Sequence, residues 1–149
     1  MKRHLTLFLL IALALGLPSL AVAAERAQVL RAINQVENPT NRTRPGPKGE
    51  LGAYQFRRGT WKMHSNEPFS MANNRVAADA VAARHYEWIK RGLVNAGMEP
   101  SVFNIALVWN SGLQAATTHR APAASYRYAT RVANLVAEAE RRQSVAAVD

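Results

Sequence analysis

The chain has 149 residues, no cysteine, and 19 lysines and arginines against 10 aspartates and glutamates. The lack of cysteine excludes a disulfide framework, a lipid-attachment thiol and thiolate ligands for a metal. The length is sufficient for one hydrophobic core and favours a single compact domain. The formal net charge of +9 favours an anionic binding partner.

The first 23 residues have the organisation of a secretory signal peptide. Lys2 and Arg3 precede an uncharged run over residues 5–17, and Ala21-Val22-Ala23 offers the small side chains that signal peptidase requires. The apolar run is shorter than the ~20 residues of a membrane-spanning helix, and a retained membrane anchor is the alternative. We therefore expect cleavage near Ala23, membrane contact only during export, and one domain over residues 24–149 in the periplasm or outside the cell.

The exported part retains 17 lysines and arginines against the same 10 acidic residues, which gives a formal charge of +7. Outside the cytoplasm the abundant anions are the carboxylates of cell-wall peptides and the phosphates of membrane or wall. Export therefore disfavours nucleic acid as the partner of this basic surface. Any single basic residue is also compatible with a role in solubility alone.

Apolar residues at helical spacing predict a first helix over about residues 25–36. Pro39 makes continuation costly, so Glu37 is expected at the helix end. A polar loop rich in proline and glycine follows over residues 38–49, and residues 51–64 predict a turn leading into a short helix.

Three more helices are predicted over about residues 73–95, 101–110 and 123–142, the first of them the longest. Asn73 or Asn74 and Ser101 are suitable N-caps, and Gly97 and Gly112 are suitable stops. Period-two alternation is scarce, so we expect an all-α domain with at most a short hairpin in the loop after the first helix.

Glu37 is the carboxylate best placed for chemistry. The four histidines show no paired helical spacing, and no phosphate-cradling glycine loop is present, so zinc and nucleotide sites have no support. Glu37 ends an apolar helix and precedes a loop that could fold over it. Burial beside an open cleft raises a carboxyl pKa and lets the group hold a proton near neutral pH. The alternative is that Glu37 caps the helix end or pairs with Arg42.

Four short motifs occur in the order found in soluble lytic transglycosylases. They are Val36-Glu37-Asn38-Pro39, Gly49-Glu50-Leu51-Gly52-Ala53-Tyr54-Gln55-Phe56, Val108-Trp109-Asn110-Ser111-Gly112 and Tyr128-Ala129-Thr130-Arg131-Val132. The sequence resembles this lysozyme-like family over nearly all of residues 24–149. The stretch Gly52–Phe56 followed by Thr60-Trp61 is also similar to resuscitation-promoting factors, which are relatives in fold and substrate.

The resemblance implies a lysozyme-like helical domain with a central glycan cleft. Glu37 would be the catalytic acid and base, and Gln55 would line the sugar cleft. Asn110 would lie near the catalytic group, and Tyr128 would hydrogen-bond toward Glu37. Without the resemblance, Gln55 and Asn110 are interpreted as helix-end caps and Tyr128 as a core residue.

Several positions depart from the family pattern. Asn38 replaces the usual serine after the glutamate, Tyr54 replaces a methionine, and Trp109 replaces a tyrosine. All three keep a polar or aromatic group suited to sugars, and we expect Tyr54 to contact substrate. Glu50 stands where the family has a small residue, which opens the question of a second carboxylate in the substrate-binding site.

The resemblance implies a lytic transglycosylase that cleaves the β-1,4 bond between N-acetylmuramic acid and N-acetylglucosamine. It implies a 1,6-anhydro product and no cofactor or metal. Two alternatives remain: a hydrolytic muramidase in which Glu50 or another carboxylate positions a water, and a non-catalytic wall-binding module. The expected partner is the peptidoglycan glycan strand. The small size also fits action beside an envelope-spanning secretion or pilus apparatus.

Overall fold

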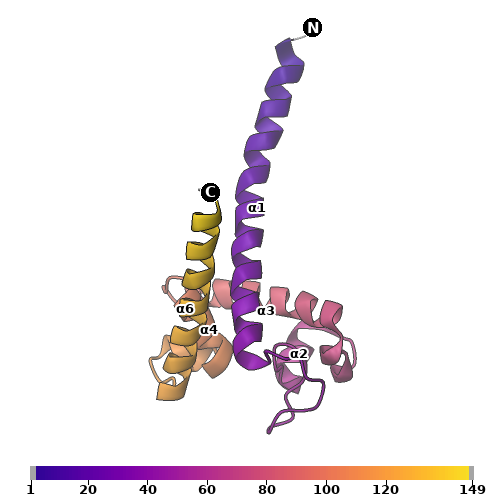
Figure 1. Cartoon of the computed structure of the whole chain (residues 1–149), viewed down its shortest axis with the longest axis vertical. Helices are drawn as coiled ribbons and strands as arrows, with labels where there is room; N and C mark the ends of the chain where they lie inside the picture. The colour runs from indigo at the N-terminus through magenta and orange to yellow at the C-terminus, as the bar shows by residue number, and fades with distance from the viewer. Residues whose placement is uncertain (1–2, 148–149) are drawn as a thin grey trace.

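The computed structural model describes the backbone of residues 3–147 and the side chains of residues 20–147 (Figure 1). Most of these residues are helical, in α1 (Arg3–Glu37), α2 (Arg58–His64), the 3₁₀ helix η1 (Phe69–Asn73), α3 (Arg75–Asn95), α4 (Val102–Ser111), α5 (Leu113–Thr117) and α6 (Ala123–Ala146). Within this part of the chain the only β pairing is an isolated antiparallel bridge between Leu51 and Phe56. The predicted all-α class is confirmed, and the single bridge agrees with the expectation of at most a short hairpin.

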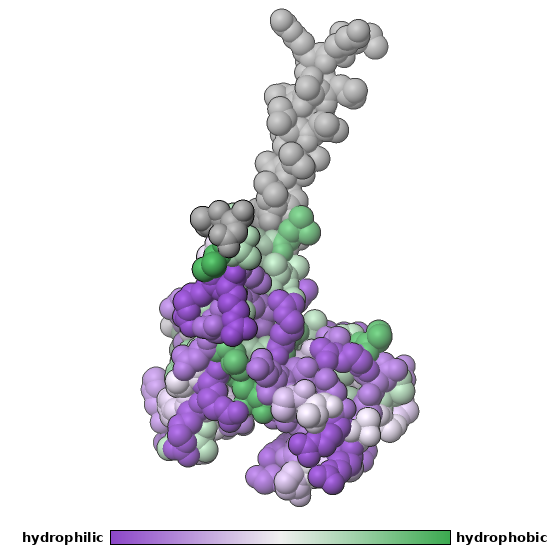
Figure 2. All heavy atoms as spheres, viewed as in Figure 1, coloured by the Kyte–Doolittle hydropathy of each residue, from purple (hydrophilic) through white to green (hydrophobic). Residues whose placement is uncertain are grey.

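The helices pack so that the end of α1 lies between two parts of the molecule. α1 and α6 are neighbours that run in opposite directions, and α3 crosses them (Figure 1). α4 packs against α6, whereas α2 and η1 pack against α3 on the other side of α1. The surface is largely hydrophilic and is indented between the α6 part and the part that carries the loop after α1 (Figure 2).

Local capping sets the predicted helix ends. The Asn74 side chain accepts a hydrogen bond of 3.0 Å from the Ala77 backbone N–H at the start of α3. Ser101 accepts one of 3.2 Å from the backbone N–H of Asn104 at the start of α4. Such caps satisfy N–H groups that have no partner in the first helical turn. The expected N-caps are therefore confirmed.

Other boundaries differ from the prediction. α1 begins at Arg3 rather than near Glu25, because the alanine-rich stretch before Glu25 favours helix. α5 was not predicted, α6 continues to Ala146, and α1 and α6 are both longer than α3. Most of the predicted signal peptide lies outside the residues whose side chains are described, so it stays a prediction. Among the described residues, no helix is long and apolar enough to cross a membrane.

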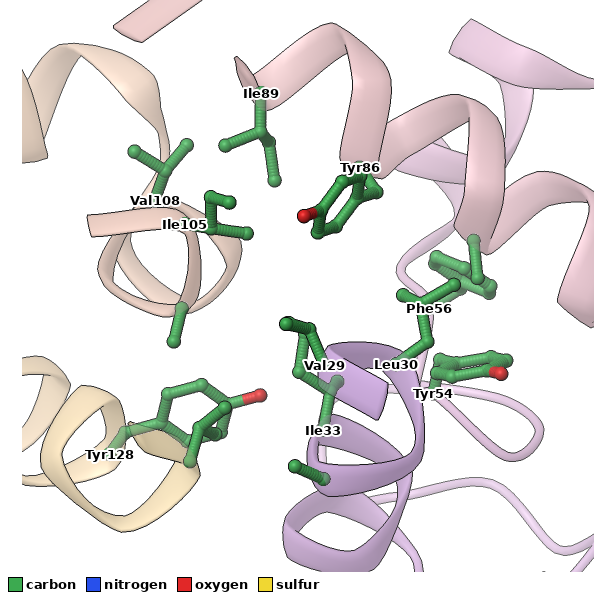
Figure 3. Packing of buried hydrophobic residues seen from close by; sticks show 14 of the residues in the cluster. Val29, Leu30, Ile33, Tyr54, Phe56, Tyr86, Ile89, Ile105, Val108 and Tyr128 are labelled. Carbon is green, nitrogen blue, oxygen red and sulfur yellow. The ribbon is translucent and has the colours of Figure 1, made fainter. Parts of the chain in front are cut away.

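One hydrophobic core joins the helices (Figure 3). Its fully buried side chains come from every long helix and include Val29, Ile33, Tyr86, Ile89, Ile105, Val108 and Val132. Burial of each such side chain contributes roughly 1.5–3 kcal/mol. The core therefore fixes the end of α1 relative to α4 and α6.

Candidate active site

Glu37 is the last residue of α1, and its side chain is partly buried. Burial raises the pKa of its carboxyl above the ordinary value, and the negative charge of Glu50 acts in the same direction. The Tyr128 hydroxyl and the charge of Arg131 partly offset this effect. Among the described residues, Glu37 makes no ion pair with Arg42, whose side chain instead donates to Thr40 at 3.0 Å. The carboxyl is thus poised to hold a proton.

Tyr128 lies on α6, close to Glu37. Its hydroxyl is buried and makes no hydrogen bond of regular geometry to a described residue. Burial raises the pKa of this phenol, and the negative charge of Glu37 raises it further. The hydroxyl therefore stays protonated and is available to donate to Glu37 when that carboxyl is charged.

A tight hairpin between Leu51 and Phe56 presents Gln55. The backbone amides and carbonyls of Leu51 and Phe56 exchange two hydrogen bonds of 2.9 and 3.0 Å. Gln55 has a positive φ of 47°, a conformation that costs a non-glycine residue roughly 1–2 kcal/mol. Its amide Nε2 donates to the Gly52 carbonyl at 2.9 Å. Strain of this kind is common at functional sites, where the surrounding structure imposes it.

Asn38, immediately after Glu37, holds the following loop in place. This side chain is buried, donates to the carbonyls of Arg42 and Gly52, and accepts from the Arg42 backbone N–H at 2.9 Å. Asn34, one turn earlier on α1, donates to the Ala53 carbonyl at 2.8 Å. The end of α1, the loop and the hairpin are therefore tied together by amide side chains.

Glu50 is held by the same loop. The Lys48 backbone N–H donates to its carboxylate at 2.8 Å, and Arg57 lies 3.8 Å from the other oxygen. Desolvation opposes ionisation of Glu50, but the Lys48 amide and the charges of Arg57 and Lys48 prevail and lower its pKa. Glu50 therefore carries a negative charge under conditions in which Glu37 can still be protonated.

Tyr54 and Asn110 are both positioned by residues from other elements. The Tyr54 hydroxyl donates to Asp79 on α3 at 2.6 Å, and the ring packs 6.1 Å from Trp109, centroid to centroid. The Ser125 hydroxyl donates to the Asn110 side-chain oxygen at 2.7 Å. The amide NH₂ of Asn110 is then left to face a ligand. Tyr54 is only 3% exposed and its hydroxyl is already engaged, so it offers a ligand little free surface.

These side chains converge on a cleft of about 540 Å³, here called the central cleft. Five of the six predicted site residues line it, namely Glu37, Glu50, Tyr54, Gln55 and Asn110. Tyr128 is not among the lining residues but lies close to Glu37. A second cleft of about 530 Å³, the loop cleft, shares Glu37 and Gln55 with the first and is lined by Arg42 and Arg44. Glu37 therefore stands where two clefts meet.

Comparison with known protein families, curated proteins and solved structures gives no match.

Several residues of the site are absent from the sequence-based prediction. His85, Trp88 and Met63 line the central cleft, and His85 bonds to His64 through ring nitrogens 2.9 Å apart. Burial, together with the neighbouring His64, lowers the pKa of His85 to about 3, so this ring is neutral at physiological pH. Within the described residues, no group of three or more potential ligands surrounds a metal position. Helical spacing gives no sign of the pair because His64 lies on α2 and His85 on α3.

Proposed function

We propose that this protein cleaves peptidoglycan glycan strands as a lytic transglycosylase, with Glu37 as the single acid and base. One observation carries the proposal: a partly buried carboxyl with a raised pKa stands at the junction of two clefts, backed by a protonated tyrosine hydroxyl. The resemblance of the four motifs to soluble lytic transglycosylases supports the same residue. Gln55 and Asn110, which line the same cleft, would contact the sugars.

The proposed reaction begins with a protonated Glu37. It donates its proton to the glycosidic oxygen between N-acetylmuramic acid and N-acetylglucosamine, and the N-acetyl group of the muramic acid attacks the anomeric carbon as the bond breaks. The Glu37 carboxylate then takes the proton of the 6-hydroxyl, whose oxygen displaces the acetamido oxygen and closes the 1,6-anhydro ring. Glu37 ends protonated, and no water is consumed.

The environment of Glu37 suits both steps. Desolvation favours the protonated form before the bond breaks, and the Tyr128 hydroxyl stabilises the carboxylate that results. The two clefts on either side of Glu37 each have the size of a typical ligand pocket. A glycan lying through both would place one glycosidic bond beside the carboxyl.

A hydrolytic muramidase is the second candidate, because Glu50 lines the same cleft and its charge acts on Glu37. Glycosidases with two carboxylates use the second one as base or nucleophile. Glu50, however, already accepts a hydrogen bond from the Lys48 amide. This hydrogen bond favours a role for Glu50 in holding the loop.

Mass spectrometry of the products from purified sacculi tests the proposal. We expect 1,6-anhydro ends from the wild type and from Glu50→Gln, and no products from Glu37→Gln. Glu99→Gln serves as a matched control, because Glu99 is exposed and lies outside the clefts. Hydrated reducing ends would identify a muramidase. A wild type that cleaves nothing, and that binds sacculi as tightly as Glu37→Gln does, would identify a wall-binding module.

A further inference from the structure

A third cleft, here called the basic cleft, adjoins the central cleft. It has a volume of about 1080 Å³. Its charged lining comprises four basic residues, Arg26, Lys62, Arg84 and Arg91, and two acidic residues, Glu67 and Glu87. The basic residues are therefore in excess.

Much of this positive charge is not neutralised by the protein. Arg26 and Glu87 form an ion pair at 2.8 Å and so cancel each other. Arg84 donates to the backbone carbonyl of His64 at 2.8 Å, a neutral acceptor that leaves its charge uncompensated. Among the described residues, Lys62 and Arg91 make no ion pair, and both are exposed. Burial and the charges of Arg84 and Arg91 lower the pKa of His64, so the histidine does not add a charge of its own.

The basic cleft adjoins the candidate active site. Met63 and Trp88 line both the central cleft and the basic cleft. Trp88 stacks on His85 with ring planes 12° apart, and His85 bonds to His64, whose side chain belongs to the basic cleft. This aromatic wall fixes Trp88 between the two clefts. Lys62, Arg84 and Arg91 therefore line a cleft that shares Trp88 with the candidate active site.

We infer that the basic cleft binds the carboxylates of the peptide stems that branch from the glycan strand. The inference rests on the proposed function, which places a glycan in the central cleft. A strand without stems keeps one carboxylate per muramic acid, on the lactyl group beside the sugar, whereas an intact stem carries its carboxylates farther from the glycan. Those carboxylates match the formal charge of +2 that remains when Glu67 is counted against Lys62, Arg84 and Arg91. Guanidinium groups match carboxylates in shape and in hydrogen-bonding geometry. The cleft would thus select strands that still carry their peptides.

The test measures binding in a Glu37→Gln background, so that no strand is cleaved. End-labelled glycan strands of equal length are prepared in two forms, one with the peptide stems intact and one with the stems removed by an amidase, and the affinities for the two forms are compared. We expect up to about tenfold tighter binding of the stem-bearing strands, because two exposed ion contacts together contribute at most on this scale. Lys62→Ala combined with Arg91→Ala should remove most of that preference and leave the affinity for bare strands unchanged.

Arg120→Ala combined with Arg127→Ala is the matched control, because both residues are exposed and belong to none of the three clefts. This pair should keep the preference for stems. Equal affinity of the parent for both strands, or equal loss in both double variants, would overturn the inference. It would also be overturned if Lys62 and Arg91 were needed for binding to phosphatidylglycerol vesicles but not to stem-bearing strands.

The binding assay separates this inference from the proposed function. If the wild type cleaves no strand but the Lys62- and Arg91-dependent preference for stems is found, the cleavage proposal fails and the binding site stands. If cleavage occurs with equal efficiency on both kinds of strand and the preference is absent, the binding site fails and the proposed function stands.

Discussion

The Tyr128 hydroxyl on α6 lies against the Glu37 carboxyl at the end of α1, and each group shifts the pKa of the other. The hydroxyl lowers the pKa of Glu37, whereas the carboxylate raises the pKa of the phenol. The phenol has no hydrogen bond of regular geometry to any described residue. The pKa of Glu37 is therefore expected to respond when the Tyr128 hydroxyl is removed.

Tyr128→Phe should shift the alkaline limb of the pH–rate profile to higher pH, because the pKa of Glu37 rises when the hydroxyl is lost. The maximal rate should fall about 10- to 100-fold, which corresponds to one hydrogen bond to a charged group. Thermal stability should be retained, since the variant removes a buried hydroxyl without a regular partner. Tyr126→Phe, on the same helix, is the control and should leave the pH profile in place. An unshifted pH–rate profile in Tyr128→Phe would show that the Tyr128 hydroxyl does not influence the ionisation of Glu37 during the reaction.

Glu37→Gln should abolish cleavage and raise the free energy of unfolding at pH 7. A carboxyl with a raised pKa binds more protons in the folded than in the unfolded chain, so wild-type stability falls as pH rises from the ordinary carboxyl range through the folded pKa. Glutamine carries no charge and escapes this loss. The stability difference should therefore vanish below pH ~4, the ordinary glutamate pKa.

Melting temperatures of the wild type and Glu37→Gln, measured from pH 3 to pH 8, check this prediction. Glu99→Gln is exposed and should follow the wild type throughout. A Glu37→Gln variant less stable than the wild type at pH 7 would mean that the carboxylate stabilises the fold, which is incompatible with a raised pKa.

Gly52→Ala should destabilise the fold by more than about 3 kcal/mol, in the range of severe steric clashes. A Cβ at this position would lie 1.8 Å from the Ala72 backbone oxygen, and the residue has a φ of +77°. Gly49 has nearly the same φ, +78°, but open space around it. Gly49→Ala should therefore cost only about 1–2 kcal/mol, the penalty for the left-handed conformation. Chemical denaturation measures the loss of stability in both variants. Equal losses would show that the cost comes from the positive φ and not from the clash with Ala72.

Gly46→Ala should impair activity more than stability. Its Cβ would lie 2.7 Å from the side-chain oxygens of both Gln55 and Glu50, which are the movable ends of flexible side chains. Both side chains must shift within the central cleft, and a displacement near 1 Å costs about a hundredfold in rate at a well-ordered site. Gly59→Ala, with nothing near its Cβ, is the control. A full rate in Gly46→Ala would show that the positions of Gln55 and Glu50 do not matter for turnover.

The family resemblance selected six site residues, and five of them line one cleft in the structure. Tyr54 is one of the five, but its surroundings differ from the expectation. Tyr54 was expected to contact substrate, and in the structure its hydroxyl donates to Asp79, 25 positions away in the chain. The partner of Asn110, Ser125, likewise lies on another helix. Hydrogen bonds of this kind depend on how α3, α4 and α6 pack, and no short sequence pattern reports them.

Local sequence determined where most helices begin and end. Asn74 and Ser101 cap their helices through residues three positions away, and Pro39 lies just past the end of α1 at Glu37, so short-range geometry was sufficient for these predictions. The family resemblance already paired Tyr128 with Glu37, but only the tertiary structure decided that His64 meets His85 and that Lys62 and Arg91 share a cleft. The physical reason is that these pairs are joined by the burial of helix faces, which depends on the packing of the whole core.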